Sequence, residues 1–435
     1  MTARLFCGTY LRSVFTPLFY LLAGPGTRDS GSALPGPVKH RLEESFMLIC
    51  HANIHTMEGR VIPDGFLRIQ GTSIGEVGGG DPPKDPGEQA VDLHGADVYP
   101  GFIDAHTHLG MWEDSLTFEG DDGNEETDPV TPQLRAVDAV NPLDRCFEDA
   151  AASGVTTVVT GPGSANPIGG QMLAMKTSGR RIDDMLLKAP LAIKMALGEN
   201  PKTVYHGKNE APSTRMATAA LIREELFKAR RYLQDIERAR ADKEADPPEY
   251  NMKCEALIPA LKRETEVHFH AHRADDIFTA IRIAKEFDLD YVIVHGTEGH
   301  LITEELKREK VRVLSGPFLA DRSKPELKNQ TPACPGVLAR SGILTAIVTD
   351  HPVTPIQYLR LCAALAVREG MDHEDALKAI TVNPAKICGL DARIGSITSG
   401  KDADLAVFRG DPLSLEARPE LVFVNGKVVS GALPS

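Results

Sequence analysis

The stretch VYPGFIDAHTHLG (residues 98–110) joins a short apolar run to two histidines, His106 and His108. Because the two are separated by one residue, they point to the same side of an extended backbone. Both imidazoles can then reach one metal ion at ~2.1 Å. Two polar side chains at the mouth of a loop would give the same pattern. The meaning of the pair therefore depends on the chain to either side of it.

The chain before this stretch, and the far C-terminal end, have the pattern of short strands. Residues 46–98 contain short alternating runs broken by EGR, PDG and GTS, which are hairpin signals. The segments GSITSGKDADLAVFRGDP (395–412) and PELVFVNGKVVSG (419–431) have the same character, with an NG turn in the second. We predict a small composite β-sandwich domain built from residues 46–98 and 390–435.

The middle of the chain, residues 99–389, alternates buried β-type runs with amphipathic helical stretches such as 275–287 and 301–309. This alternation favours a parallel sheet, and eight such units close into a (β/α)8 TIM barrel of the α/β class. An open doubly wound sheet is the alternative, but it would need a glycine-rich loop after the first strand, and the sequence has none there. A charged helix at 214–246 is expected to be a solvated insertion. The predicted strands are VYPGFID (98–104), VTTVVT (155–160), GGQMLAM (169–175), PLAIKMAL (190–197), TEVHFH (265–270), DYVIVH (290–295), VRVLSG (311–316) and ILTAIVT (343–349).

Lys194 interrupts the apolar fourth strand, LAIKMAL. A lysine inside a buried strand is costly unless it is paired, so a salt-bridged core lysine is one interpretation. The other is chemical. A buried lysine with a depressed pKa can react with carbon dioxide, and the resulting carbamate has two oxygens that could bridge two metal ions.

The fifth strand ends VHFHAHRADDI, which places three histidines on one face. We favour His270, at the strand end, as a metal ligand. His268 lies deeper and could belong to the core or support a ligand. His272 is expected in the following loop, where it could touch substrate or metal.

The sixth and eighth strands also end in ligand-type residues. His295 ends VIVH, with Glu298 and His300 in the loop that follows, where His300 could equally cap the next helix. Asp350 follows AIVT, where a catalytic carboxylate would stand, although a helix N-cap would also suit it. Nitrogen and oxygen ligands at strand ends suit Zn²⁺, with Mn²⁺ or Fe²⁺ as substitutes.

The ordered motifs PGFIDAHTH, IKMAL, VHFHAH, VIVHGTE, AIVTDH, ITVNPAKICGL and GSITSGKDADLAVF resemble the amidohydrolase superfamily. More narrowly, they are similar to imidazolonepropionase-like and prolidase-like metal-dependent hydrolases. The resemblance covers residues 46–430, with a poor match over 206–246. It implies a barrel hydrolase that cleaves carbon–nitrogen bonds with a metal-activated hydroxide.

By position, the resemblance assigns each motif residue a role. It implies that Asp350 acts as general base and then passes the proton to the leaving amine. Lys194, as a carbamate, would bridge two metals, and Glu199 in ALGENPK is the substitute bridge if Lys194 is only structural. The implied metal ligands are His106, His108, Lys194, His270, His295 and Asp350.

One departure narrows the activity. Deaminases and true imidazolonepropionases of the superfamily tend to have a glutamate two or three residues after the fifth-strand histidine, where this chain has His272 and Arg273. This counts against both activities and leaves an amide, cyclic amide or dipeptide-like bond, with a prolidase-like dipeptidase as the close rival. A metal-free scaffold is disfavoured because no ligand is missing.

Several loop residues are candidates for binding the substrate. Arg273, Arg322 and Lys324 lie after strand ends and could take a substrate carboxylate, although ordinary surface charge explains them as well. The candidate substrate contacts are His272, Arg273, Glu298 and His300.

Composition limits the partners. The net charge of −13 and the pI of about 5.6 argue against nucleic acid. Seven scattered cysteines indicate reduced thiols and a cytoplasmic protein. Residues 1–45 are expected to be a disordered extension or a targeting-like segment, and a signal segment within residues 1–30 would make the protein exported. We expect a small-molecule substrate and no membrane partner, and a homo-oligomer is compatible with the sequence.

Overall fold

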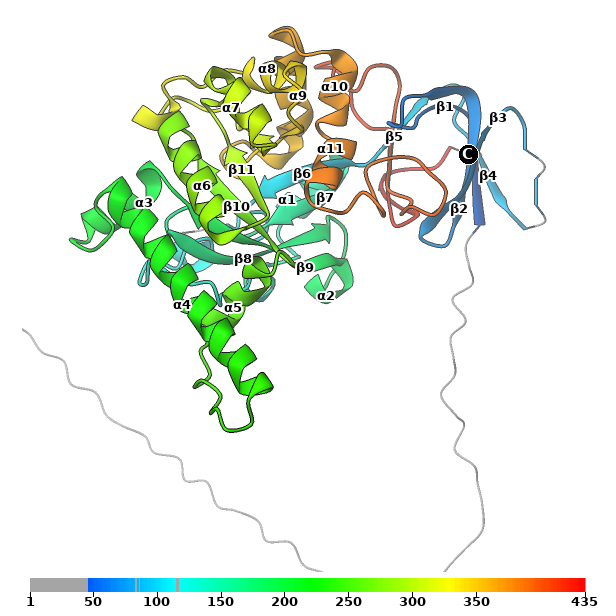
Figure 1. The fold of residues 1–435 in the computed structure, drawn as a ribbon. Helices are drawn as coiled ribbons and strands as arrows, with labels where there is room; N and C mark the ends of the chain where they lie inside the picture. The colour runs from blue at the N-terminus through cyan, green and yellow to red at the C-terminus, as the bar shows by residue number, and fades with distance from the viewer. Residues whose placement is uncertain (1–45, 83, 86, 115–116, 435) are drawn as a thin grey trace, which may run out of the picture. The chain divides into compact units, whose positions relative to one another are not determined.

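Eight strands of the computed structural model, which describes residues 46–82, 84–85, 87–114 and 117–434, form a barrel sheet (Figure 1). The expected fold class is confirmed, and each predicted strand has a counterpart. The predictions for residues 1–45 lie outside the described residues. The strands, in the order in which they pair, are β6 (Phe102–Thr107), β7 (Val155–Thr160), β8 (Ile168–Lys176), β9 (Leu186–Ala196), β10 (Glu266–Ala271), β11 (Tyr291–His295), β12 (Arg312–Ser315) and β13 (Thr345–Ile347).

Strand β8 corrects one expectation, because it runs antiparallel to both of its neighbours. The barrel is therefore not made of eight parallel strands. The cause is the length of the connections. A parallel crossover needs a dozen or more residues, whereas β7 and β8 are joined by residues 161–167 alone, and 177–185 contain only the short α2 (Ile182–Met185). As a result the 161–167 connection lies at the carboxyl end of β7, where the other strand ends carry their polar residues.

Hydrogen bonds bring the first and last barrel strands together. The Asp350 amide donates to the His106 carbonyl at 3.1 Å, and the His108 amide donates to the His351 carbonyl at 2.8 Å. Below them, the buried carboxylate of Asp104 accepts from the amide of Thr349 at 3.0 Å and from its hydroxyl at 2.6 Å. The nearly closed barrel thus has its two end strands joined beside the motif histidines.

The helices lie around the barrel strands, with α6 (Ala274–Phe287) beside β10 and β11 (Figure 1). The expected stretch at 275–287 is α6. In the described part of the chain, no helix is long and apolar enough to cross a membrane. The remaining α-helices are α1 (Cys146–Ala152), α3 (Glu199–Gly207), α4 (Arg215–Ala241), α5 (Met252–Leu261), α7 (Thr303–Arg308), α8 (Cys334–Arg340), α9 (Leu359–Arg368), α10 (His373–Lys378) and α11 (Val382–Ile387). Short 3-10 turns lie at η1 (Phe118–Gly120), η2 (Ala136–Asp138), η3 (Gly299–Leu301), η4 (Pro325–Leu327) and η5 (Ile356–Tyr358).

The insertion between β9 and β10 is more buried than its charge suggested. Helix α4 starts after Thr214, whose side chain accepts a hydrogen bond from the Ala217 amide at 3.1 Å, as an N-cap does. Its Ile222 and Leu226 are fully buried in the cluster that also holds α5 and α6. Only one side of the charged helix is solvated.

The second sheet combines strands from both ends of the described chain, as predicted. Strand β1 links its parts, because its first half pairs with β4 and its second half with β5, and hydrogen bonding makes the eight strands one sheet. It surrounds its own apolar cluster. The strands are β1 (Phe46–His55), β2 (Val61–Gln70), β3 (Ser73–Gly79), β4 (Gln89–Asp92), β5 (Asp97–Pro100), β14 (Leu405–Phe408), β15 (Leu421–Val424) and β16 (Lys427–Gly431).

The chain passes from this sheet into the barrel at Gly101, between β5 and β6. The predicted single strand VYPGFID is therefore two strands that belong to different sheets. A side chain at position 101 would collide with Thr156 of β7. Glycine suits this position because a Cβ atom would overlap the Thr156 side chain.

Candidate metal centre

The first part of the site lies where β6 and β13 end. The Nε2 atoms of His106 and His108 are each 3.3 Å from the Asp350 Oδ1 atom. The Nδ1 atom of His108 donates to the Gly161 carbonyl at 2.7 Å, which fixes its tautomer and turns Nε2 toward Asp350. Asp104 accepts from the His106 amide at 3.2 Å and so joins the motif to the last strand.

The electrostatics of this part favour an ionised Asp350 and a neutral His106. Burial alone would raise the pKa of Asp350, but His295, His106 and His108 outweigh it and hold this pKa well below its usual range. Burial, followed by the charge of Lys194, lowers the pKa of His106 well below its usual value. Neutral imidazole and carboxylate are the protonation states in which these side chains bind a metal.

The backbone at two of these residues is unusual. Asp350 has φ +55° and His295 has φ +74°. Residues other than glycine rarely adopt this left-handed region, and it costs on the order of 1–3 kcal/mol. The fold holds both side chains at the site despite that cost, which is typical of functional positions.

Lys194 lies beside the same histidines and has no exposed surface. Its Nζ atom is 3.2 Å from the Pro162 carbonyl oxygen, to which it donates, and 3.5 Å from His106 Nε2. Burial lowers the pKa of Lys194 to about 8, against the opposing charge of Asp350. The structure does not show a salt-bridged core lysine, because the polar contacts of Lys194 among the described residues are a carbonyl and an imidazole.

The second part of the site lies at the ends of β10 and β11. One potential ligand atom from each of His270, His272 and His295 lies within 4.8 Å of the others, and the same holds for His106, His295 and Asp350. His295 belongs to both groups, and its Nδ1 atom donates to the Gly316 carbonyl at 2.8 Å. Burial lowers the pKa of His295 to about 4 and those of His270 and His272 well below the usual value. Two potential ligand groups therefore share one histidine.

The supports of the second part include residues that the sequence did not indicate. The Ser164 hydroxyl is 2.9 Å from His270 Nδ1, and the Thr297 hydroxyl is 2.7 Å from His272 Nδ1. Glu326, also unforeseen, places its Oε1 atom 3.7 Å from His272 Nε2. In the sequence, Glu326 is marked only by its position two residues after Lys324, a candidate for binding the substrate.

Some predicted residues lie away from the ligand groups. His268 contacts Glu266 at 3.2 Å, one layer deeper in the barrel. Arg273 forms a two-bond ion pair with Asp275 at the start of α6. Arg322 donates to the carbonyl of Gln330 at 2.8 Å.

The loop after β11 is held by its own contacts. Glu298 accepts from the Ala274 amide and the Asn329 side chain, both at 2.8 Å, so it caps α6. His300 approaches the Thr297 carbonyl at 3.1 Å. Neither contact directs the side chain toward the histidine groups.

A third group of potential ligands, Cys50, His51 and Asp92, lies in the second sheet. His51 Nδ1 is 2.8 Å from the Asp92 carboxylate, so a hydrogen bond already accounts for this pair. All three residues are half-exposed, unlike the barrel histidines.

The donor set in the barrel fits divalent metal ions. Main-chain carbonyls occupy the Nδ1 atoms of His108 and His295, which leaves their Nε2 lone pairs for a ligand. His106 Nδ1 is buried without a hydrogen-bond partner. Imidazole and carboxylate donors of this kind suit Zn²⁺ and its neighbours in the first transition row.

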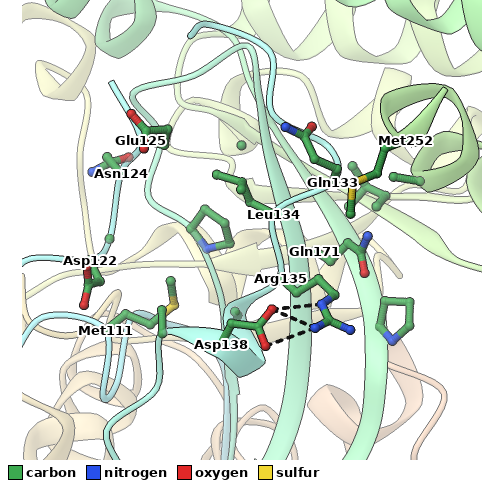
Figure 2. Close-up of a pocket in the computed structure, with 18 of the residues that line it drawn as sticks. Met111, Asp122, Asn124, Glu125, Gln133, Leu134, Arg135, Asp138, Gln171 and Met252 are labelled. Carbon is green, nitrogen blue, oxygen red and sulfur yellow. Dashed lines mark hydrogen bonds and ion pairs between the residues drawn. The ribbon is translucent and has the colours of Figure 1, made fainter. Parts of the chain in front are cut away.

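A cavity of about 1250 Å³ lies beside the barrel, outside these groups (Figure 2). The segment around Leu134, strands β8 and β9, and helix α5 line it, and Arg135 and Asp138 pair within it. Its lining includes Pro162, whose carbonyl accepts from Lys194, but none of the barrel histidines. The cavity therefore does not include the two histidine groups.

Comparisons with known sequences agree with this architecture. The Amidohydrolase family model matches residues 98–430. The chain is 31% identical to the amidohydrolase tasK of Hapsidospora irregularis over 369 residues, 79% of this chain, and it spans only 38% of that relative's length. It is 26% identical to the imidazolonepropionase of Erwinia tasmaniensis over 436 residues, which covers 88% of this chain and 94% of the relative.

Solved structures give the same result. An amidohydrolase from Thermotoga maritima superposes with a TM-score of 0.86 at 42% identity, covering 89% of this chain and all of that one. A prolidase in complex with N-methylphosphonate-L-proline superposes with a TM-score of 0.57 at 18% identity over the same shares, and supports the fold alone. Enzymes of this family are generally dependent on divalent metals, and the His/Asp groups are candidate sites for them. The chain belongs to the amidohydrolase family and is a hydrolytic enzyme that acts on carbon–nitrogen bonds.

Proposed function

We propose that the protein is a binuclear metal-dependent hydrolase that cleaves an amide, cyclic amide or dipeptide-like bond in a small molecule. The observation that carries this proposal is the pair of ligand groups that share His295. Because the two groups meet at His295, their imidazole and carboxylate donors lie close enough together to hold two neighbouring metal ions.

The residues divide between the two positions. His106, His108 and Asp350 would hold one metal, and His270 with His295 would hold the other, with Zn²⁺ as the favoured ion and Mn²⁺ or Fe²⁺ as alternatives. Lys194 would lie between them as a carbamate. Bound there, the metals would lower the pKa of a water molecule and polarise the scissile carbonyl.

Asp350 would move the proton. Its carboxylate has a lowered pKa and keeps 15% of its side chain exposed, so it can accept a proton from the attacking water. Once protonated, it would donate to the nitrogen as the carbon–nitrogen bond breaks. His106 and His108 place their Nε2 atoms 3.3 Å from the carboxylate, so a metal ion held by them would lie next to it.

The alternative bridging residue has a different local role. Glu199 accepts a hydrogen bond from the Glu326 amide at 3.3 Å and begins α3. Lys194, in contrast, already lies 3.5 Å from His106. Lys194 is therefore the better candidate for the bridge.

A metal-loaded hydrolysis screen tests the proposal. Protein treated with a chelator would be reconstituted with Zn²⁺ and bicarbonate, and assayed on N-acyl amino acids, dipeptides, cyclic amides and nucleobase amines. We expect hydrolysis of an amide-type substrate, about two metal equivalents, and no deamination. Release of ammonia from a ring amine, or fewer than one tightly bound metal with no gain on adding Zn²⁺, would refute it.

A further inference from the structure

Glu326 is a fully buried carboxylate in the loop after β12. Such a group is rarely buried unless it is paired. Its Oε2 atom accepts from the Glu199 amide at 2.9 Å, while the Glu326 amide donates to the Glu199 side chain, so two hydrogen bonds fasten η4 to the start of α3. These bonds fix the position of the second carboxylate oxygen, Oε1.

Lys324 is held by that oxygen. Its Nζ atom is 2.8 Å from Glu326 Oε1 and donates to the Asn200 side-chain oxygen at 2.6 Å. An ammonium group has three donors. One donates to Asn200, and the contact with Glu326 is an ion pair, so among the described residues the ammonium group keeps donor capacity for a ligand. The Lys324 side chain is 28% exposed, so a ligand can reach it.

This pair borders the second histidine group. Asn200 Nδ2 is 3.5 Å from His270 Nε2, and Glu326 Oε1 is 3.9 Å from the same nitrogen. The unused ammonium donor and the amide NH₂ group therefore lie on the edge of the centre where a substrate would bind. Both groups are hydrogen-bond donors, and Lys324 offsets the charge of Glu326, so the donors can bind a carboxylate without net repulsion from Glu326.

We propose that Lys324 and Asn200 bind a carboxylate of the substrate, and that Glu326 is the positioning residue that aims Lys324. This inference rests on the proposed hydrolase function and names its substrate class: amides in which a free carboxylate lies near the scissile bond. The other two cationic candidates are engaged elsewhere, because Arg273 pairs with Asp275 and Arg322 donates to the Gln330 carbonyl.

A matched pair of ligands tests the carboxylate site without turnover. Calorimetry on the zinc-loaded protein would compare N-methylphosphonate-L-proline with its C-terminal carboxamide, which has a similar shape and lacks that negative charge. We expect the acid to bind about ten- to a hundredfold more tightly, the range for a hydrogen bond to a charged group. Lys324→Met should abolish the preference by weakening only the acid, while Arg322→Met in the same loop should keep it.

Glu326→Gln separates positioning from a merely structural role. It should reduce the acid-over-amide ratio while the affinity for the amide stays within about twofold, whereas a loss of folding would weaken both ligands. Equal affinities in the wild type, failure of the acid to bind, or a Lys324→Met protein with the full preference would overturn the carboxylate site. Hydrolysis in the substrate screen would still support the proposed function in each of those cases, so the two ideas fail separately.

Discussion

The two halves of the candidate centre are held in different ways. The half formed by His106, His108 and Asp350 is fixed mainly by the barrel itself, through hydrogen bonds between the backbones of the first and last strands. The half formed by His270 and His272 is fixed mainly by side chains from loops, namely Ser164, Thr297 and the Glu326 loop.

This difference between the two halves indicates which of them can tolerate changes in sequence. Main-chain hydrogen bonds depend on the strand register and survive most substitutions. Side-chain supports depend on single residues in loops, which tolerate changes in sequence and carry specificity. We infer that the first half sets the reaction and that the second half sets which substrate is accepted.

The largest expected effect is on the first half. Asp350→Asn should lower kcat by about 10²–10⁴-fold, because an amide cannot take the proton from water. The measurement is kcat on the substrate found in the screen, with metal content and circular dichroism recorded alongside. Asp138→Asn, in an exposed ion pair with Arg135, is the control and should leave kcat unchanged. An Asp350→Asn enzyme within threefold of wild type would remove Asp350 from catalysis.

The residue between the halves should respond to pH and carbon dioxide together. Only the neutral amine forms a carbamate, and burial lowers the pKa of Lys194 to about 8. At fixed dissolved carbon dioxide, the rate of reactivation by Zn²⁺ should therefore rise about tenfold per pH unit below pH 8 and level off above it. Lys194→Arg, which stays protonated, should not reactivate. A rate of reactivation that does not depend on the carbon dioxide concentration would argue for Glu199 as the bridge instead.

A support of the first half should show a smaller effect. Asp104→Asn replaces the carboxylate that accepts from the His106 amide and from Thr349, and we expect about 10–100-fold lower metal affinity or activity. Thr349→Val, alone and combined with Asp104→Asn, tests whether the two residues act through their shared contact. If they do, the loss in the double variant should be smaller than the sum of the two single losses. Fully additive losses would show that Asp104 acts independently of Thr349.

The smallest effect should come from a loop support of the second half. Ser164→Ala removes one neutral hydrogen bond to His270, which corresponds to about two- to tenfold in kcat/KM. Ser213→Ala, whose hydroxyl contacts only an exposed loop carbonyl, is the matched control. A loss larger than that of Asp104→Asn would reverse the ranking of the two halves.

The sequence predicted the parts that follow from periodicity. Short apolar runs, most of them rich in β-branched residues, located the eight barrel strands, and a barrel brings the carboxyl ends of its parallel strands to one face. Reading the residue at each strand end was therefore enough to nominate His106, His295 and Asp350, which the structure brings into one group. Their roles as ligands remain a prediction.

The parts that the sequence missed depend on direction and on loop paths. A strand has the same two-residue period whichever way it runs, so nothing in GGQMLAM indicated that β8 is reversed. Ser164 and Glu326 lie in loops, where no period predicts which way a side chain points. Arg273 and Glu298 were nominated by closeness to strand ends, but their side chains turn to α6 instead.

The reversed strand β8 also has a consequence for how the chain folds. Strands β7, β8 and β9 form an antiparallel meander whose contacts join residues close in sequence. The parallel pairs elsewhere in the barrel can form only after a longer connecting segment has been closed into a loop. The entropy lost on closing a loop is smallest for such local pairing. We therefore expect the meander to form early in the folding reaction and to offer its edge strands, β7 and β9, as templates on which the rest of the barrel assembles.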